Sequence, residues 1–426
     1  MKKKQIELFL MQALVACVAC IIMAQMLGIS IISTVAFYMT FPLTVALWVW
    51  TMRRGVTKLD YLAVAAVALA AICVLLDLWR SVGALTGKYP RKVIMLGMAL
   101  IFMSAADRCR VDDRLTEFTQ VLVDILTVLS GVMLLIAHDR MHLINGVVSR
   151  YITLGFSNPN SLSLFVTCMY MLTFSYMFRK QSAKQRYFHI AVLTAQIFIL
   201  LGTHCRTGQM AALLFTAAGL CIRYRDKVKK LTGLRVPMKI NRWVAVSIAL
   251  FPMVFAMVYM SVVDAQWVEK LFSFIISEGK GIDSRVEQWT PAFEAITSSP
   301  LIGAYHAISK GTGSSQLHNT HVDTAASYGV PVMLLVSGIM AICIYQKGKR
   351  YENGLRFMYM LAFCCAMLMG TFEAAVFSGG LGIYVFAILF LALSKCDEAP
   401  TEDCGWNRIE RTGKDLVQFV GTRLKK

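Results

Sequence analysis

The chain has 426 residues, of which 57% are hydrophobic and only 16% are charged, and its mean hydropathy is +0.60. A soluble domain of this size needs far more polar surface, so the composition excludes a soluble globular protein. The formal net charge of +18 would suit a nucleic-acid partner, but the basic residues are grouped in alternate loops between apolar runs. That pattern orients membrane helices, so we expect anionic lipid headgroups, and not nucleic acid, as the partners of these clusters.

Apolar runs long enough to cross the hydrocarbon core, which takes roughly 20 residues, recur along the chain. We expect an all-α fold, a polytopic transmembrane helical bundle of about 12 spans. The expected spans are 8–29, 31–50, 61–79, 92–107, 115–137, 154–178, 188–203, 208–222, 243–263, 322–345, 356–372 and 377–394. An even number places both termini in the cytoplasm together with the main basic clusters. A smaller basic group, residues 80–92, then falls on the opposite side.

This topology divides the chain into four parts. Membrane helices one to nine occupy 1–263, and an extracytoplasmic loop that contains short helices occupies 264–321. Helices ten to twelve occupy 322–394, and a polar cytoplasmic tail occupies 395–426. The loop is the one long stretch outside the expected membrane region, and it concentrates arginine, histidine and tryptophan. Polar groups gathered at a membrane face are suited to chemistry on a lipid-linked substrate.

The seventh and eighth spans are unusually close together. Both Arg186 and Arg223 are expected on the cytoplasmic side, and the roughly 36 residues between them are fewer than the 40 or so that two full crossings need. The hairpin tip, 203–208, is therefore expected below the outer membrane surface. A cation at that depth is costly unless it faces a polar cavity or a counter-ion. We therefore expect Arg206 to line a recessed pocket that water can enter.

The loop also predicts a helix from Asp283 to about Ile296. Its Arg285, Gln288 and Trp289 share one face by their helical spacing. An arginine there suits phosphate oxygens, an amide can bind a sugar, and a tryptophan suits the apolar face of a sugar or an isoprenoid chain. The same pattern is also typical of an amphipathic helix on the membrane surface with an ordinary exposed arginine. The pattern alone leaves both interpretations open.

Two histidines and an asparagine stand at the start of the tenth span, as His318, Asn319 and His321. An imidazole titrates near neutrality and can act as a general base. The alternative is a passive role in capping the helix or contacting the headgroup region. The spacing of the histidines permits a metal pair, but no H-E-x-x-H or cysteine pattern accompanies it. We therefore predict no metal and no cofactor.

A third polar segment precedes the sixth span, where Asn158 and Asn160 flank Pro159. An Asn-Pro-Asn sequence bends the chain and exposes amide groups. Those amides are candidates for substrate binding, and the alternative is a simple helix-entry turn.

Taken in order, these motifs resemble a known family. They are Gly-Phe-Ser-Asn-Pro-Asn, an arginine at a tight hairpin, Ser-Arg-x-x-x-Trp, Ser-Pro-Leu-Ile-Gly, and His-Asn-x-His followed by Tyr-Gly-Val-Pro. Over about Gly155 to Pro331 the chain resembles the O-antigen ligase and O-antigen polymerase family of membrane glycan transferases. The resemblance implies transfer of a glycan from a polyprenyl diphosphate to a glycan or lipid acceptor, on the outer face of the cytoplasmic membrane. It implies neither a metal nor a nucleotide sugar.

The resemblance places the family's functional arginines at Arg206 and Arg285 and its histidine at His318. Two departures stand out, because Cys205 replaces a common serine and 303–305 replaces a common Gly-x-Gly. We expect a repeat-unit polymerase. The alternatives are a ligase that transfers the finished glycan and, more remotely, a flippase or other transporter, or a membrane scaffold or sensor without catalysis.

Overall fold

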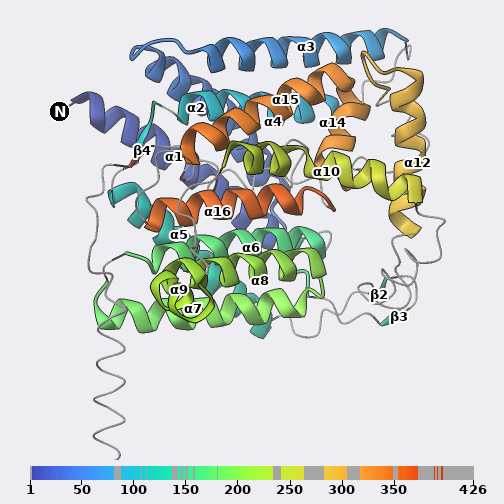
Figure 1. Cartoon of the computed structure of the whole chain (residues 1–426). Helices are drawn as coiled ribbons and strands as arrows, with labels where there is room; N and C mark the ends of the chain where they lie inside the picture. The colour runs from blue at the N-terminus through green and yellow to red at the C-terminus, as the bar shows by residue number, and fades with distance from the viewer. Residues whose placement is uncertain are drawn as a thin grey trace, which may run out of the picture.

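The computed structural model of the chain describes residues 2–80, 88–106, 108–111, 113–136, 143–144, 147–148, 152–156, 159–179, 181–233, 241–262, 283–304, 317–348, 354–372, 388, 391 and 395–396. In this part the protein is helical, apart from four two-residue strands (Figure 1). The first eight helices are α1 (Lys2–Met26), α2 (Ser30–Met52), α3 (Lys58–Arg80), α4 (Lys88–Ala106), α5 (Asp113–Ile136), α6 (Pro159–Tyr176), α7 (Ala183–Gly202) and α8 (Arg206–Arg223). The others are α9 (Arg225–Thr232), α10 (Arg242–Val262), α12 (Asp283–Ser298), α14 (Thr320–Tyr328), α15 (Val330–Gly348) and α16 (Gly354–Met369).

The strands form two small pairs. Strand β1 (Arg110–Val111) pairs in parallel with β4 (Lys395–Cys396), and β2 (Leu143–Ile144) pairs with β3 (Val147–Val148) in antiparallel. Through the first pair, residues 395–396 lie beside the connection between α4 and α5.

Among the described residues, five helices are long and apolar enough to cross a membrane: Lys4–Met26, Ser30–Met52, Lys58–Arg80, Asp113–Leu135 and Arg242–Val262. Three further apolar helices are shorter, at Lys92–Ala106, Val330–Gln346 and Phe357–Met369. Large apolar side chains point outward from the long helices, as with Ile31, Leu75 and Leu135. An apolar surface of this kind is suited to lipid and not to water. The chain is therefore built as a helical membrane protein.

The total of about 12 spans stays a prediction, and two of the expected spans need comment. The expected twelfth span, 377–394, lies outside the described residues except for 388 and 391. The expected tenth span, 322–345, is wrong as a single helix, because it is divided at Gly329 into α14 and α15. Gly329 has a φ of +86°, and a Cβ there would lie 2.3 Å from the carbonyl oxygen of Leu301. A chain that must turn in so little space needs a glycine.

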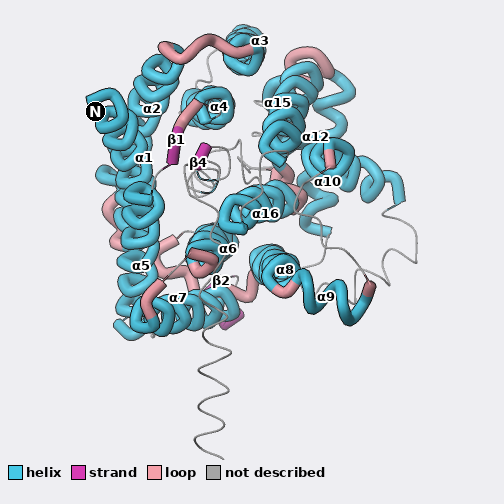
Figure 2. The backbone as a smooth tube through the Cα atoms, turned by 60° about the vertical axis from the view of Figure 1, so that its left-hand side comes forward, coloured by secondary structure: helices cyan, strands magenta, loops and turns pink. Residues whose placement is uncertain are grey.

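The bundle has a central group of helices surrounded by others (Figure 2). Helices α4, α6 and α16 occupy the centre, and side chains on every face of α6 are buried along most of its length. Helix α6 runs parallel to α8, since Gly208 packs on Ser163 while Gly219 packs on Phe174 three turns further along. Helix α16 runs the opposite way, with Met358 against Gly219.

Charged side chains link four helices at one end of the bundle. Arg54 pairs with Glu7 and also donates to the carbonyl of Arg108. Arg108 is buried and binds both carboxylate oxygens of Asp60, which also accepts the indole N–H of Trp48 at 2.7 Å. Arg108 is thus held by protein groups, whereas the Arg54 side chain stays 38% exposed beside its ion pair; contact of these clusters with lipid headgroups stays a prediction.

Candidate functional site

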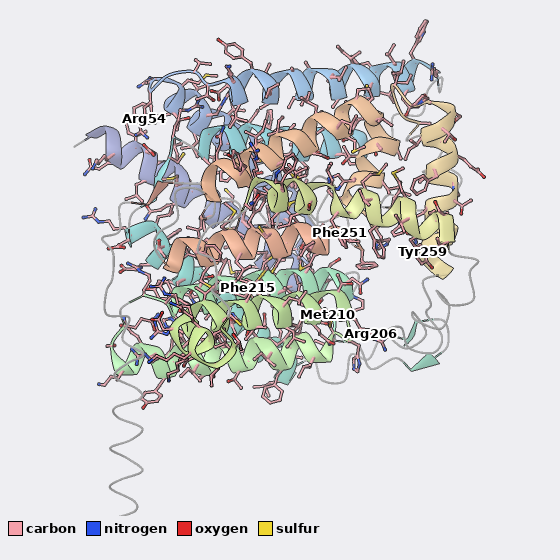
Figure 3. The ribbon with its side chains drawn as sticks, in the orientation of Figure 1. Arg54, Arg206, Met210, Phe215, Phe251 and Tyr259 are labelled. Atoms are coloured by element: carbon pink, nitrogen blue, oxygen red, sulfur yellow. The ribbon has the colours of Figure 1, made fainter. Side chains whose placement is uncertain are left out.

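Arg206 and the end of α10 lie at the same end of the bundle, opposite Arg54 (Figure 3). Along α8 the labelled residues run from Phe215 through Met210 to Arg206, and along α10 they run from Phe251 to Tyr259 in the same direction. We call the two ends of the molecule the Arg54 end and the Arg206 end. The motifs named above that the structure describes lie towards the Arg206 end.

Helix α12 lies across the Arg206 end instead of along the bundle axis (Figure 1). Its Trp289 is 1% exposed, and the indole N–H donates to the carbonyl of Leu317 at 2.7 Å. The ring also meets Tyr259 edge-on, with 5.9 Å between the centroids. The expectation of an open aromatic platform at Trp289 is therefore wrong in this structure, because both the ring and its N–H are used to hold the segment before α14.

Asn319 fixes the start of α14 to α10 and to the turn that follows α16. Its side-chain oxygen accepts from the N–H groups of His321 and Val322, both at 3.0 Å, and so caps the helix. Its side-chain nitrogen donates to the carbonyls of Pro252 at 2.8 Å and Thr371 at 2.9 Å. All four bonds are buried, and a buried, fully bonded amide specifies one arrangement. Asn319, expected to bind substrate, has its side-chain groups occupied by the protein itself.

The start of α14 lies well inside the bundle. Pro252 is ten residues before the end of α10, which at 1.5 Å per residue is about 15 Å below that end. At the other end of α14, the Leu301 carbonyl lies 3.9 Å from the Cys73 sulfur, and Cys73 is about 10 Å below the end of α3 by the same measure. Non-helical backbone at such depth in a membrane protein is tolerated where it is buried in protein or lines a polar cavity.

The Ser-Pro-Leu-Ile-Gly turn and the Tyr-Gly-Val-Pro turn dock on each other. The N–H of Val330 donates to the carbonyl of Pro300 at 2.8 Å, and the N–H of Ala304 donates to Ala326 at 2.8 Å. Gly303 has a φ of +72°, and a Cβ there would lie 2.6 Å from the Ala326 oxygen. The sequence shows only the order of these two turns along the chain. In the structure they bind each other and together support the C-terminal end of α14.

The two histidines beside Asn319 have different surroundings. His318 is half-buried and has a φ of +49°, a left-handed conformation that few side chains adopt. His321 is 2% exposed, and neither ring nitrogen makes a hydrogen bond within the described part of the chain. The backbone of Ala249 in α10 lies close to the ring.

Arg206 is the first residue of α8 and is exposed at the tip of the α7–α8 hairpin. Helix α8 has 18 residues, or about 27 Å at 1.5 Å per residue, slightly less than the roughly 30 Å hydrocarbon core. The preceding His204 has a φ of +52°. Two residues into α8, Gly208 backs onto the hydroxyls of Ser163 and Thr167, which are buried and make no hydrogen bond among the described residues. Asn160, half-buried, starts the same face of α6 one turn earlier.

The remaining candidate residues are described only in part. The backbone of Arg285 is in α12, but its side chain lies outside the described residues, as does Asn158 altogether. Gln288 is half-buried, and its side-chain oxygen makes no hydrogen bond in the part of the chain described. In that part no cluster of three histidine, cysteine, aspartate or glutamate side chains is arranged to hold a metal ion.

Sequence reasoning missed a buried ion pair near this site. Lys92 of α4 binds both carboxylate oxygens of Asp323 in α14, at 2.8 and 3.0 Å. Lys92 was instead assigned to a basic group in a loop. The available signal was a lysine and an aspartate within otherwise apolar segments, since such residues need a partner at membrane depth.

These features define a helical membrane protein with a recessed polar segment at one end of its bundle. No family model matches the chain, and no curated protein matches it significantly.

Proposed function

We propose that the chain is a membrane glycosyltransferase that polymerises repeat units of a surface polysaccharide, with a polyprenyl-diphosphate-linked glycan as donor. The observation that carries the proposal is the position of the start of α14, which is held inside the bundle towards the Arg206 end. It brings the half-buried His318 inside the helices, while Arg206 stands at the same end of the bundle. A lipid-linked substrate requires such a combination, because its tail stays in the membrane while its charged and polar groups need a sheltered polar site.

The proposed topology has about 12 spans, with the Arg206 end on the outer face of the cytoplasmic membrane. Helix α15 would supply the tenth crossing, and α14 would be embedded without crossing. Two relationships support an even number of crossings: Arg54 binds Glu7 near the N-terminus, and Lys395 pairs with Arg110. Both ends of the described chain thus lie at the Arg54 end, where basic loops would face the cytoplasm.

The proposed reaction is a single displacement. The acceptor hydroxyl attacks the anomeric carbon as the bond to the diphosphate oxygen breaks, and the polyprenyl diphosphate leaves. Arg206 and Arg285 stabilise the charge on that leaving group, and one close pair of unit charges is worth up to about 4 kcal/mol at an effective dielectric near 20. His318 takes the hydroxyl proton, which is typically an effect of about 10²–10⁴-fold. The reaction inverts the anomeric configuration.

A ligase differs from a polymerase only in the acceptor. A polymerase uses another lipid-linked glycan as acceptor, whereas a ligase uses a terminal lipid or wall acceptor. Both would bind the same donor with the same residues, so the site itself fits either activity.

Transport of a lipid-linked glycan is the second candidate, and a buried polar network favours it. Gln196 of α7 donates to Thr127 of α5 at 2.9 Å and to Thr173 of α6 at 3.2 Å, and all three side chains are buried. Transporters often place polar groups and broken helices near the bilayer midplane. The network has a simpler role as well, since polar bonds hold helices together where water does not drive their association.

Surface glycan chain length separates these activities. The gene is deleted and replaced by Arg206→Ala, Arg285→Ala or His318→Asn. Asparagine is chosen at 318 because it tolerates positive φ. Arg223→Ala, at the opposite end of the same helix, is the matched control. Polymerisation predicts single-repeat glycan with the three site variants and normal chains with the control. Full-length glycan left on the carrier would indicate ligation, repeat units held on the inner leaflet would indicate transport, and unchanged glycan would contradict all three.

A further inference from the structure

The Lys92–Asp323 pair is buried on both sides. The ammonium lies 2.8 and 3.0 Å from the two carboxylate oxygens, and each side chain is 5% exposed. Removing two charges from water costs several kcal/mol per ion, and a well-packed apolar pair of similar size is often as stable or more stable. Stability therefore does not explain why these two charges lie here.

The pair has a geometrical consequence that an apolar contact lacks. Asp323 is one helical turn after Asn319, and the two residues attach the first turn of α14 to different helices. Asn319 holds α10 through Pro252 and the turn after α16 through Thr371, while Asp323 holds α4. One anchor fixes where the helix starts, and the second fixes its rotation about that point. His318 immediately precedes the first anchor, so both anchors determine where its imidazole lies.

We propose that Lys92 and Asp323 are positioning residues for His318, and this inference rests on the proposed role of His318 as the base. Neither charge touches substrate. Their bond holds the start of α14 at the rotation that brings the imidazole to the acceptor hydroxyl. An error of about 1 Å in such an arrangement can reduce a rate about a hundredfold.

Three variants test the pair in the full-length protein, purified into lipid vesicles. The probe is the polyprenyl-diphosphate-linked repeat unit extracted from the deletion strain. Lys92→Met breaks the pair, Lys92→Met with Asp323→Leu replaces it with an apolar contact, and Lys92→Asp with Asp323→Lys exchanges the charges. We expect the apolar pair to melt at or above the wild-type temperature but to transfer glycan about tenfold to a hundredfold more slowly at saturating donor. The exchanged pair should recover to within about threefold of wild type, with KM for the donor changed by less than about twofold in each case.

The inference is overturned if the apolar pair transfers glycan at the wild-type rate, since packing alone would then suffice. It is equally overturned if the exchanged pair melts like wild type but stays as slow as Lys92→Met. A shift in the midpoint of the rate–pH profile would also contradict it, because the pair would then be tuning a pKa instead of a position. Failure of the proposed function looks different: wild-type protein would show no transfer, or His318→Asn would transfer at the full rate.

Discussion

The side-chain amide of Asn319 lies 2.8 Å from the carbonyl oxygen of Pro252, and this bond joins the start of α14 to the middle of α10. Pro252 lies inside α10, and its carbonyl anchors the segment that starts α14. The contact holds the start of α14 inside the bundle, about 15 Å below the end of α10 at 1.5 Å per residue.

Replacing Asn319 by alanine should destabilise the protein by about 3 kcal/mol or more, because it removes a helix cap and leaves two buried carbonyls short of a donor. Asn241→Ala is the control, since Asn241 accepts from the N–H of Trp243 at 2.9 Å on an exposed helix start. The control should cost only about 1 kcal/mol. Thermal melting in detergent measures both, and equal losses would mean that the interhelical bonds add little.

Trp289→Phe should cost about 1–3 kcal/mol, because it leaves the buried carbonyl of Leu317 without its indole donor. Trp243→Phe, at a tryptophan that is 66% exposed, should stay within about 0.5 kcal/mol of wild type. Melting and donor affinity are measured together. If Trp289→Phe lost much donor affinity without losing stability, Trp289 would instead be a substrate-binding residue.

Gly303 and Gly233 offer a test of the docked turns. Their φ values are +72° and +71°, but a Cβ at Gly303 would meet backbone at 2.6 Å whereas one at Gly233 would meet nothing within 4 Å. Alanine at either position costs about 1–2 kcal/mol for the backbone conformation, and only Gly303→Ala adds a clash with backbone. We therefore expect a clearly lower melting temperature for Gly303→Ala. Similar melting temperatures would mean that the two turns can separate without cost.

The sequence was sufficient to predict the helical membrane fold, because long apolar runs have few other solutions. It also predicted the helix from 283, observed as Asp283–Ser298, and the hairpin before Arg206. It could not show which face of that helix is buried, so Trp289 was taken for a binding surface. Nor could it pair Lys92 with Asp323, which are 231 residues apart. The break at Gly329 was hidden because an apolar sequence on both sides looks like one continuous span.

Glycan transfer by the purified protein tests the central proposal most directly. Protein in lipid vesicles is given the polyprenyl-diphosphate-linked repeat unit, and elongated lipid-linked glycan and released polyprenyl diphosphate are both quantified. With wild type and Arg223→Ala we expect one released polyprenyl diphosphate for each new linkage in the elongated glycan, and with His318→Asn we expect a rate lower by about 10²–10⁴-fold. No product from wild type, or an undiminished rate from His318→Asn, would contradict it.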